Sequence, residues 1–172
     1  MGRCFCNGGI VLVGAAGNEG NPSGRGDNMI YPARYENLIA VAATDENDER
    51  AKWSSTGPAV ELAAPRVDIL STYLDGYAYA SGTSMACPHV SGTVALLLNT
   101  PIDVSYDLDG DGVWDLDEVR MKLNNTADDL GPAAKDEKYG YGLVDADEAC
   151  GVKTPPSSGG KNACQRHFNM VH

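Results

Sequence analysis

Basic residues are scarce in this chain, and long apolar runs are absent. The 172 residues include 13 lysines and arginines against 24 acidic residues, which gives a formal net charge of −11. Nucleic-acid-binding proteins need basic surfaces that neutralise phosphates, so this balance argues against a nucleic-acid partner and against anionic membranes. The longest apolar runs, Ile10 to Val13 and Val94 to Leu98, are far shorter than the roughly 18 residues of a membrane helix. We therefore expect a soluble chain that binds neither nucleic acid nor membrane.

A signal peptide and a regular cysteine pattern are also missing. The first residues lead directly into the apolar run at Ile10, without the basic and apolar regions of a secretory leader. The five cysteines form neither metal-type pairs nor an even disulfide framework, so they do not assign a redox compartment. A bridge between Cys150 and Cys164 stays open as an alternative.

The apolar fraction of 42% is enough for a core, and its pattern indicates an α/β protein. The continuous apolar runs Ile10 to Val13 and Leu38 to Ala43 are typical of strands buried on both faces of a parallel sheet. Shorter strands are expected at Val60 to Ala64 and Val67 to Tyr73. From Thr83 onward, about four turns of small and apolar residues predict a buried helix.

The chain divides into two parts by composition. Residues 1–150 carry the predicted strands and helices and are expected to form one domain. Residues 151–172 are rich in proline, serine, glycine and lysine, which predicts a flexible tail or linker.

Ser84 follows Gly82 at the predicted start of the long helix. A helix N-terminus presents free N–H groups and the positive end of the helix dipole, so it stabilises an oxyanion that forms when a serine attacks an acyl group. A serine that merely caps the helix is the alternative interpretation of this position taken alone.

Two longer motifs favour the catalytic interpretation. Residues 82–90, Gly-Thr-Ser-Met-Ala-Cys-Pro-His-Val, resemble the nucleophile signature of the subtilisin-like serine proteases, the subtilases. Residues 15–20, Ala-Ala-Gly-Asn-Glu-Gly, resemble the segment that bears their oxyanion-hole asparagine. The similarity extends over about residues 9–149. Further matching segments are Tyr31 to Tyr35, Ile39 to Val41, Ser54 to Pro58, Ala64 to Pro65 and Tyr139 to Val144.

The resemblance implies a fold and a set of roles. It implies part of a three-layer subtilisin-like fold, with a mainly parallel sheet flanked by helices. Ser84 is expected to be the nucleophile of a serine endopeptidase, with its own N–H and the Asn18 amide as oxyanion donors. The substrate would be a polypeptide. The substrate-binding residues implied by the resemblance are Ala15, Ala16, Gly17 and Gly82.

Two members of the catalytic triad have no match in the chain. Subtilases place the catalytic aspartate and histidine before the asparagine, and only 17 residues precede Asn18. His89 lies five residues after Ser84, about 140° around the helix axis, so its ring is not expected to act as the base. His167 and His172 match nothing in the family. The resemblance therefore implies the C-terminal half of a catalytic domain that is almost inactive alone and needs its N-terminal half as a partner.

An acidic segment, residues 107–118, fits the twelve-residue EF-hand loop that binds Ca²⁺. Gly112 stands at the sixth position, where the loop must turn, and a helix is expected from about Asp117 to Asn125. No entering helix is expected before the loop, so it resembles the half-hand loops of dockerins. A solvated acidic loop is the alternative. The expected calcium ligands are Asp107, Asp109, Asp111, Asp115, Glu118 and the carbonyl of Val113.

Two functions follow from these motifs. The first is a serine endopeptidase, placed outside the cell or on its surface by the habit of the family. The second is a calcium-binding or interaction module, derived from a protease, that has no catalytic activity of its own.

Overall fold

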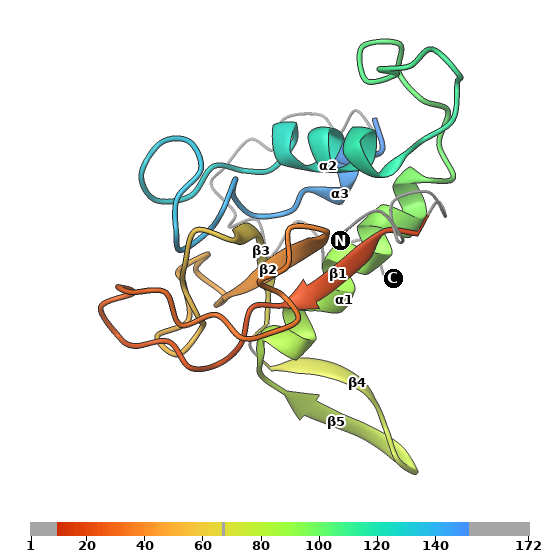
Figure 1. Cartoon of the computed structure of the whole chain (residues 1–172). Coiled ribbons are helices and arrows are strands. Elements are labelled where there is room, and N and C mark those ends of the chain that lie inside the picture. Colours follow the sequence, from red (N-terminus) through yellow and green to blue (C-terminus); the bar gives the residue numbers. More distant parts are fainter. Residues whose placement is uncertain (1–9, 67, 152–172) are drawn as a thin grey trace, which may run out of the picture.

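The computed structural model describes residues 10–66 and 68–151 (Figure 1). The predicted tail from residue 152 onward, together with Cys164, His167 and His172, lies outside the described residues. The elements follow one another as β1 (Leu12–Ala15), β2 (Leu38–Thr44), β3 (Val60–Pro65), β4 (Ile69–Tyr73), β5 (Gly76–Ala80), α1 (Thr83–Leu97), α2 (Leu116–Asn125) and α3 (Ala146–Ala149).

The first three strands form a parallel sheet in the order β1-β2-β3, as the apolar runs predict. Val13 pairs with Ile39, and Val41 pairs with Leu62. β1 begins two residues later than predicted and extends to Ala15, so a residue expected to bind substrate lies at the end of a strand. The α/β class with a parallel sheet is therefore confirmed.

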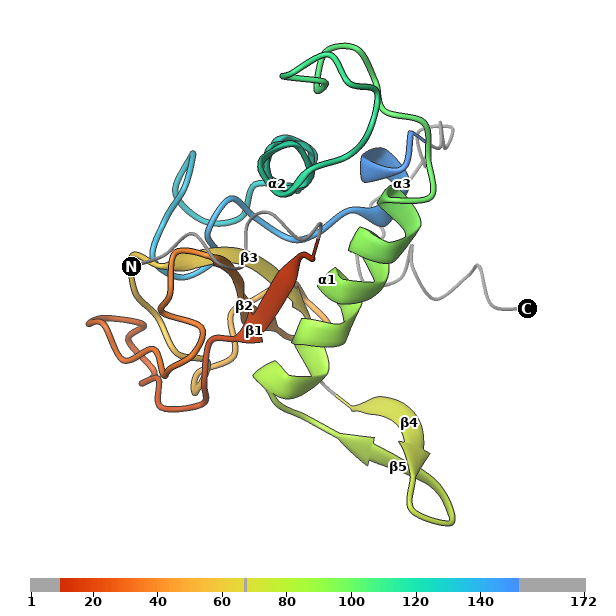
Figure 2. The ribbon, with the colours of Figure 1, turned by 45° about the vertical axis from the view of Figure 1, so that its right-hand side comes forward.

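β4 does not join this sheet. It pairs in antiparallel fashion with β5, which the sequence did not predict, and the two strands form a hairpin that projects from the body (Figures 1 and 2). The hairpin turns at Leu74 and Asp75, where Leu74 has a positive φ of 46°. The last residue of β5, Ala80, precedes Ser84 by four positions, so the hairpin leads directly into the nucleophile motif.

All three described helices contribute to a core on one face of the sheet. α1 crosses this face and contacts β1, β2 and β3 (Figure 2). Loop residues such as Met29 and Ala33 cover the opposite face, where they pack on Ala40 and Ala42 of β2. The described residues therefore form two layers, and the third layer expected from the resemblance is not among them.

The segment that contains Tyr139 to Val144 covers the outer edge of β3. The N–H of Ala63 donates to Gly142 O (2.8 Å), and that of Val144 donates to Ala63 O (3.0 Å). Gly140 has a φ of +66°, and a Cβ atom there would lie 2.2 Å from the Glu61 carbonyl oxygen. Only glycine fits so close to the strand, which is a physical reason for the glycines of this motif.

A buried ion pair joins α2 to β3. Arg120 of α2 donates to both carboxylate oxygens of Glu61, whose side chain is only 5% exposed. Asn124 also donates to Glu61 (3.2 Å), and Arg120 donates to the Glu36 carbonyl (2.6 Å). The hydrogen bonds with Glu61 raise the pKa of Arg120 above its ordinary value. The helix that follows the acidic loop is therefore fixed to the central sheet.

Among residues 10–66 and 68–151, no helix combines the length and the apolar character that a membrane crossing requires.

Candidate active site

Ser84 lies in the first turn of α1 and is exposed. The cap residue of this helix, Gly82, has no side chain that could satisfy the free N–H groups. Asn18 does so from a distant loop, because its Oδ1 accepts from both the N–H and the hydroxyl of Thr83, each at 3.1 Å. The fold thus brings the two residues predicted to be catalytic, 66 positions apart, to one helix terminus.

The hydrogen bonds of Asn18 also orient its amide. Since Oδ1 is occupied by Thr83, the Nδ2 group is the end available to another acceptor. Nδ2 lies 3.7 Å from the position that a Cβ atom on Gly82 would take. The N–H of Ser84 itself has no acceptor among the described residues. Asn18 Nδ2 and the Ser84 N–H, both at the start of α1, are therefore two donors without an acceptor among the described residues.

The loop that carries Asn18 is held on both sides. The Gly17 N–H donates to the Thr83 hydroxyl (3.2 Å), and the Gly17 carbonyl accepts from the Ser55 N–H (2.9 Å). The Ser55 hydroxyl in turn accepts from the Glu19 N–H (3.1 Å). These contacts fix the backbone immediately before and after Asn18.

Arg50 also holds the loop that carries Asn18, although no sequence pattern predicted a role for it. Its guanidinium donates to the carbonyls of Asn21 (2.7 Å), Ala51 (2.8 Å) and Ser54, so it connects the Asn18 loop to the loop after β2. Burial lowers the pKa of Arg50 from its ordinary value, and the Coulombic interaction with Tyr139 opposes this. No sequence pattern marks Arg50, because its partners are backbone carbonyls and one of them, that of Asn21, is 29 positions away.

The residues expected to bind substrate differ in exposure. Ala15 is half-buried, whereas Ala16, Gly17 and Gly82 are buried. The Ala16 methyl group packs into the core below the sheet, and its N–H and C=O bind Val41 O (2.9 Å) and Ile30 N (3.0 Å). Its side chain therefore lies in the core, and its role in substrate binding stays a prediction that concerns its backbone.

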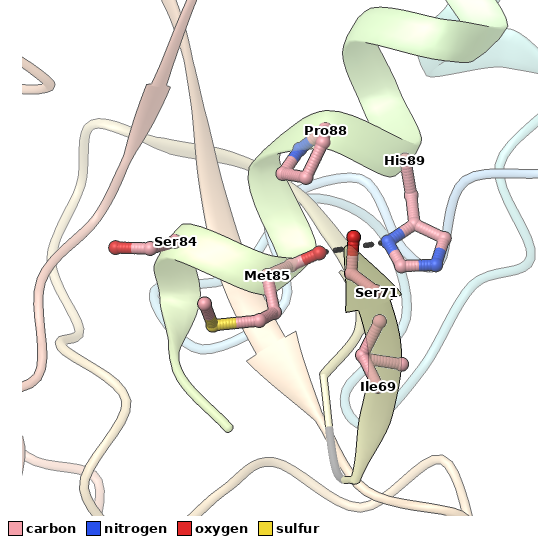
Figure 3. Close-up of a pocket in the computed structure, with 6 residues that line it drawn as sticks. All are labelled: Ile69, Ser71, Ser84, Met85, Pro88 and His89. Carbon is pink, nitrogen blue, oxygen red and sulfur yellow. Dashed lines mark hydrogen bonds between the residues drawn. The ribbon is translucent and has the colours of Figure 1, made fainter. Parts of the chain in front are cut away.

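A hollow of about 410 Å³ adjoins Ser84 between α1 and the hairpin (Figure 3). His89 stands at this hollow, and its Nδ1 lies 2.8 Å from the Met85 carbonyl, to which it donates. The Ser84 side chain points away from the His89 ring (Figure 3). This arrangement agrees with the expectation that His89 does not act as the base. The six lining residues are Ile69, Ser71, Ser84, Met85, Pro88 and His89.

Cys87 lies three residues after Ser84, and its thiol is not activated as an alternative nucleophile. Burial raises the pKa of the Cys87 thiol above its ordinary value, although a hydrogen bond with Ser91 opposes this. A thiol acts as a nucleophile in its ionised form, so a raised pKa keeps Cys87 unreactive near neutral pH.

The acidic loop brings three of its six predicted ligands together. Oxygen atoms of Asp107, Asp109 and Glu118 all lie within 4.8 Å of one another, so this group has room for a metal ion. Their carboxylates are the hard oxygen donors that Ca²⁺ prefers. The carboxylates of Asp111 and Asp115 are outside this group. Asp111 accepts from the Val113 N–H (2.7 Å), and Asp115 accepts from the Glu118 N–H (3.0 Å).

The acidic loop is held by hydrogen bonds within the loop and by a contact with the region after α1. Glu118 is fully buried, and it accepts from the N–H groups of Leu108 (2.7 Å) and Asp115 (2.9 Å). Together with Asp115 it forms a capping box that starts α2, close to where the sequence predicts the exit helix. Trp114 donates from its indole N–H to Thr100 O (3.0 Å), just beyond the end of α1.

Comparison with known proteins agrees with these motifs. The sequence model of the Subtilase family matches residues 6–142. A thermostable alkaline protease of Halalkalibacterium halodurans is 43% identical over 144 residues, which are 83% of this chain and 35% of that protein. Subtilisin DY of Bacillus licheniformis is 42% identical over 142 residues, which are 82% of this chain and 47% of that protein.

A third relative is the minor extracellular protease Epr of Bacillus subtilis, 40% identical over 138 residues, or 79% of this chain and 19% of that protein. The chain thus spans less than half of the length of these curated relatives. The family match covers most of the chain and includes both Asn18 and Ser84. The chain belongs to the subtilase family.

Proposed function

We propose that this chain is the part of a serine endopeptidase that carries the nucleophile and the oxyanion hole. The observation that supports this most directly is the contact of Asn18 with Thr83 in the first turn of α1, the helix that carries Ser84. The Ser84 oxygen attacks the peptide carbonyl, and the resulting oxyanion accepts from Asn18 Nδ2 and from the Ser84 N–H. The C–N bond then breaks, and the acyl group stays on Ser84 until water removes it.

The reaction also needs a base that takes the Ser84 proton and passes it to the leaving amine. The position of His89 supports the proposal that this base, and its aspartate, come from polypeptide outside this chain. Without the base, only binding and oxyanion stabilisation remain, so the chain alone is almost inactive. The name of the relative Epr includes "extracellular", which supports a location outside the cell or on its surface.

A fluorophosphonate probe tests this proposal. The chain alone is expected to be labelled slowly, because Ser84 lacks its base. Addition of a fragment of a related subtilisin that holds the catalytic aspartate and histidine is expected to give rapid labelling at Ser84, measured by mass spectrometry. We refer to this combination as the complemented enzyme.

Two serine variants give the controls for the labelling. Ser84→Ala is expected to abolish it, whereas Ser91→Ala, which changes another exposed serine of α1, is expected to leave it unchanged. Rapid labelling of the chain alone would contradict the proposed need for a second half. No labelling of the complemented enzyme would favour the module without catalytic activity.

We also propose that the acidic loop binds Ca²⁺ and stabilises the fold. The grouping of Asp107, Asp109 and Glu118 supports this, and bound Ca²⁺ would relieve the repulsion between their carboxylates. Because Glu118 lies in the first turn of α2, the ion would stabilise the helix that carries Arg120. The ion has a structural role in this proposal and takes no part in the reaction.

Calcium is expected to raise the melting temperature of the chain. At about one hundred times the dissociation constant the gain is about 2.7 kcal/mol, or roughly 5–10 °C for a domain of this size. Differential scanning fluorimetry in calcium and in chelator measures this shift, and Trp114 fluorescence reports the loop directly. Asp109→Asn should remove the shift, whereas Asp117→Asn, on an exposed neighbour outside the group, should keep it. An equal shift in both variants, or none in the native chain at millimolar calcium, would contradict the site.

A further inference from the structure

The Arg50 guanidinium contacts the loop that carries Asn18 at two points. Its Nη2 donates to the Asn21 carbonyl (2.7 Å), three residues after Asn18. A Cβ atom on Gly24 would lie 3.0 Å from both Nε and Nη2 of Arg50, so the loop backbone passes directly against the guanidinium. Gly24 has a φ of +60°, in the left-handed region that favours glycine. These two contacts fix the distance between the loop and Arg50.

The rest of Arg50 is bound to other parts of the fold. Its Nη1 donates to the carbonyls of Ala51 (2.8 Å) and Ser54, and its backbone N–H donates to the Tyr139 hydroxyl (3.0 Å). Among the described residues, no carboxylate forms an ion pair with Arg50. A planar guanidinium holds several carbonyls in fixed directions, which the single ammonium of a lysine on its flexible stem does not. Arg50 is therefore a rigid link between the loop that carries Asn18 and the loop after β2.

We propose that Arg50 is a positioning residue that sets the place of the Asn18 amide in the oxyanion hole. This inference rests on the proposed function, in which Asn18 Nδ2 donates to the oxyanion. The contact with Thr83 orients the amide, and Arg50 holds the backbone that carries it. Arg50 itself contacts neither the substrate nor the reacting atoms in this proposal. A displacement of about 1 Å in an active site costs about a hundredfold in rate, so a loosened loop has a large effect.

The kinetic test uses Arg50→Lys in the complemented enzyme. This variant keeps the positive charge and loses the fixed fork of donors, so kcat should fall by about ten- to a hundredfold while KM changes little. Arg25→Lys, which changes an exposed arginine of the same loop, is the matched control and should keep kcat. If Arg50→Lys does not fold, Gly24→Ala serves the same purpose, because its added methyl group displaces the loop from the guanidinium. An unchanged kcat would overturn the inference.

A double variant distinguishes positioning from general damage to the fold. Because Arg50 acts through Asn18 in this proposal, Asn18→Ala/Arg50→Lys should have the same kcat as Asn18→Ala alone. Residues that act independently give losses that multiply. A kcat in the double variant that is lower than that of Asn18→Ala by the full factor lost in Arg50→Lys would also overturn the inference.

A measurement without catalysis separates this inference from the proposed function. If the native complemented enzyme cleaves no peptide, the proposed function fails, and hydrogen exchange in the chain alone still decides the role of Arg50. The Thr83 N–H, which Asn18 Oδ1 accepts, should exchange about ten times faster in Arg50→Lys, measured by NMR. The Val144 N–H, bound to Ala63 at the outer edge of β3, should exchange at the native rate. Equal exchange of Thr83 in both proteins, or faster exchange at both sites, overturns the inference.

Discussion

The variant Asn18→Ala of the complemented enzyme is expected to lower kcat by about a hundredfold to a thousandfold and to change KM little. In the proposed mechanism, Asn18 Nδ2 is one of two donors to the oxyanion, which carries its full charge only as the reaction proceeds. Removing such a donor destabilises the transition state more than it destabilises the bound substrate. Steady-state kinetics on a peptide amide measures both constants.

Asn18 also caps α1, so its structural and catalytic roles need separation. Asn18→Asp keeps an oxygen that accepts from Thr83 but loses the amide donor. It should therefore preserve the cap, worth about 1 kcal/mol, and still lose most of the rate. Asn21→Ala, which removes a side chain bonded to Arg25 O in the same loop, is the matched control and should keep the rate. Full activity of Asn18→Asp would contradict the assignment.

The variant Arg120→Met is expected to destabilise the chain by about 3–5 kcal/mol, because the buried Glu61 carboxylate loses its partner. Asn124 is the other side chain that donates to Glu61, and a neutral amide does not compensate the charge. Urea unfolding followed by circular dichroism measures the free energy of unfolding.

Two further variants identify the cause of this loss. Arg34→Met breaks the ion pair with Asp27, where both side chains are about one-third exposed, and should cost less than about 1 kcal/mol. The double variant Glu61→Leu/Arg120→Met removes both charges and should recover much of the stability lost in Arg120→Met. Equal losses of stability in Arg120→Met and Arg34→Met would contradict this explanation, because they would show that burial of Glu61 does not increase the cost of losing its partner.

The strands and helices that depend on a local sequence pattern were predictable from the sequence. The apolar runs around Val13, Ile39 and Leu62 indicated the parallel strands, because burial on both faces leaves a continuous apolar signal. The small and apolar residues after Thr83 indicated α1, and the acidic residues before Val119 indicated where α2 begins.

Features that depend on distant contacts were not predictable in the same way. The hairpin partner β5 was missed because alternating tyrosine and alanine, with both tyrosines exposed, gives no clear buried face. The cap that Asn18 provides for Thr83 spans 65 positions, and Arg50 donates to the Asn21 carbonyl across 29 positions. The EF-hand pattern predicted five carboxylate ligands, and those of Asp107, Asp109 and Glu118 are grouped, because a sequence pattern gives the spacing of ligands and not the orientation of each side chain.

The separation between the two ends of α1 has a practical consequence for protein engineering. Ser84 lies at one end of this 15-residue helix, and Thr100, which binds Trp114, lies just beyond the other, roughly 20 Å away at 1.5 Å per residue. The exposed turn around Gly110 and Gly112 is farther along the chain, and both glycines have a positive φ (77° and 75°), so they are best kept as glycine. A dye or an affinity handle attached beside this turn would therefore give access to the molecule while leaving the nucleophile untouched.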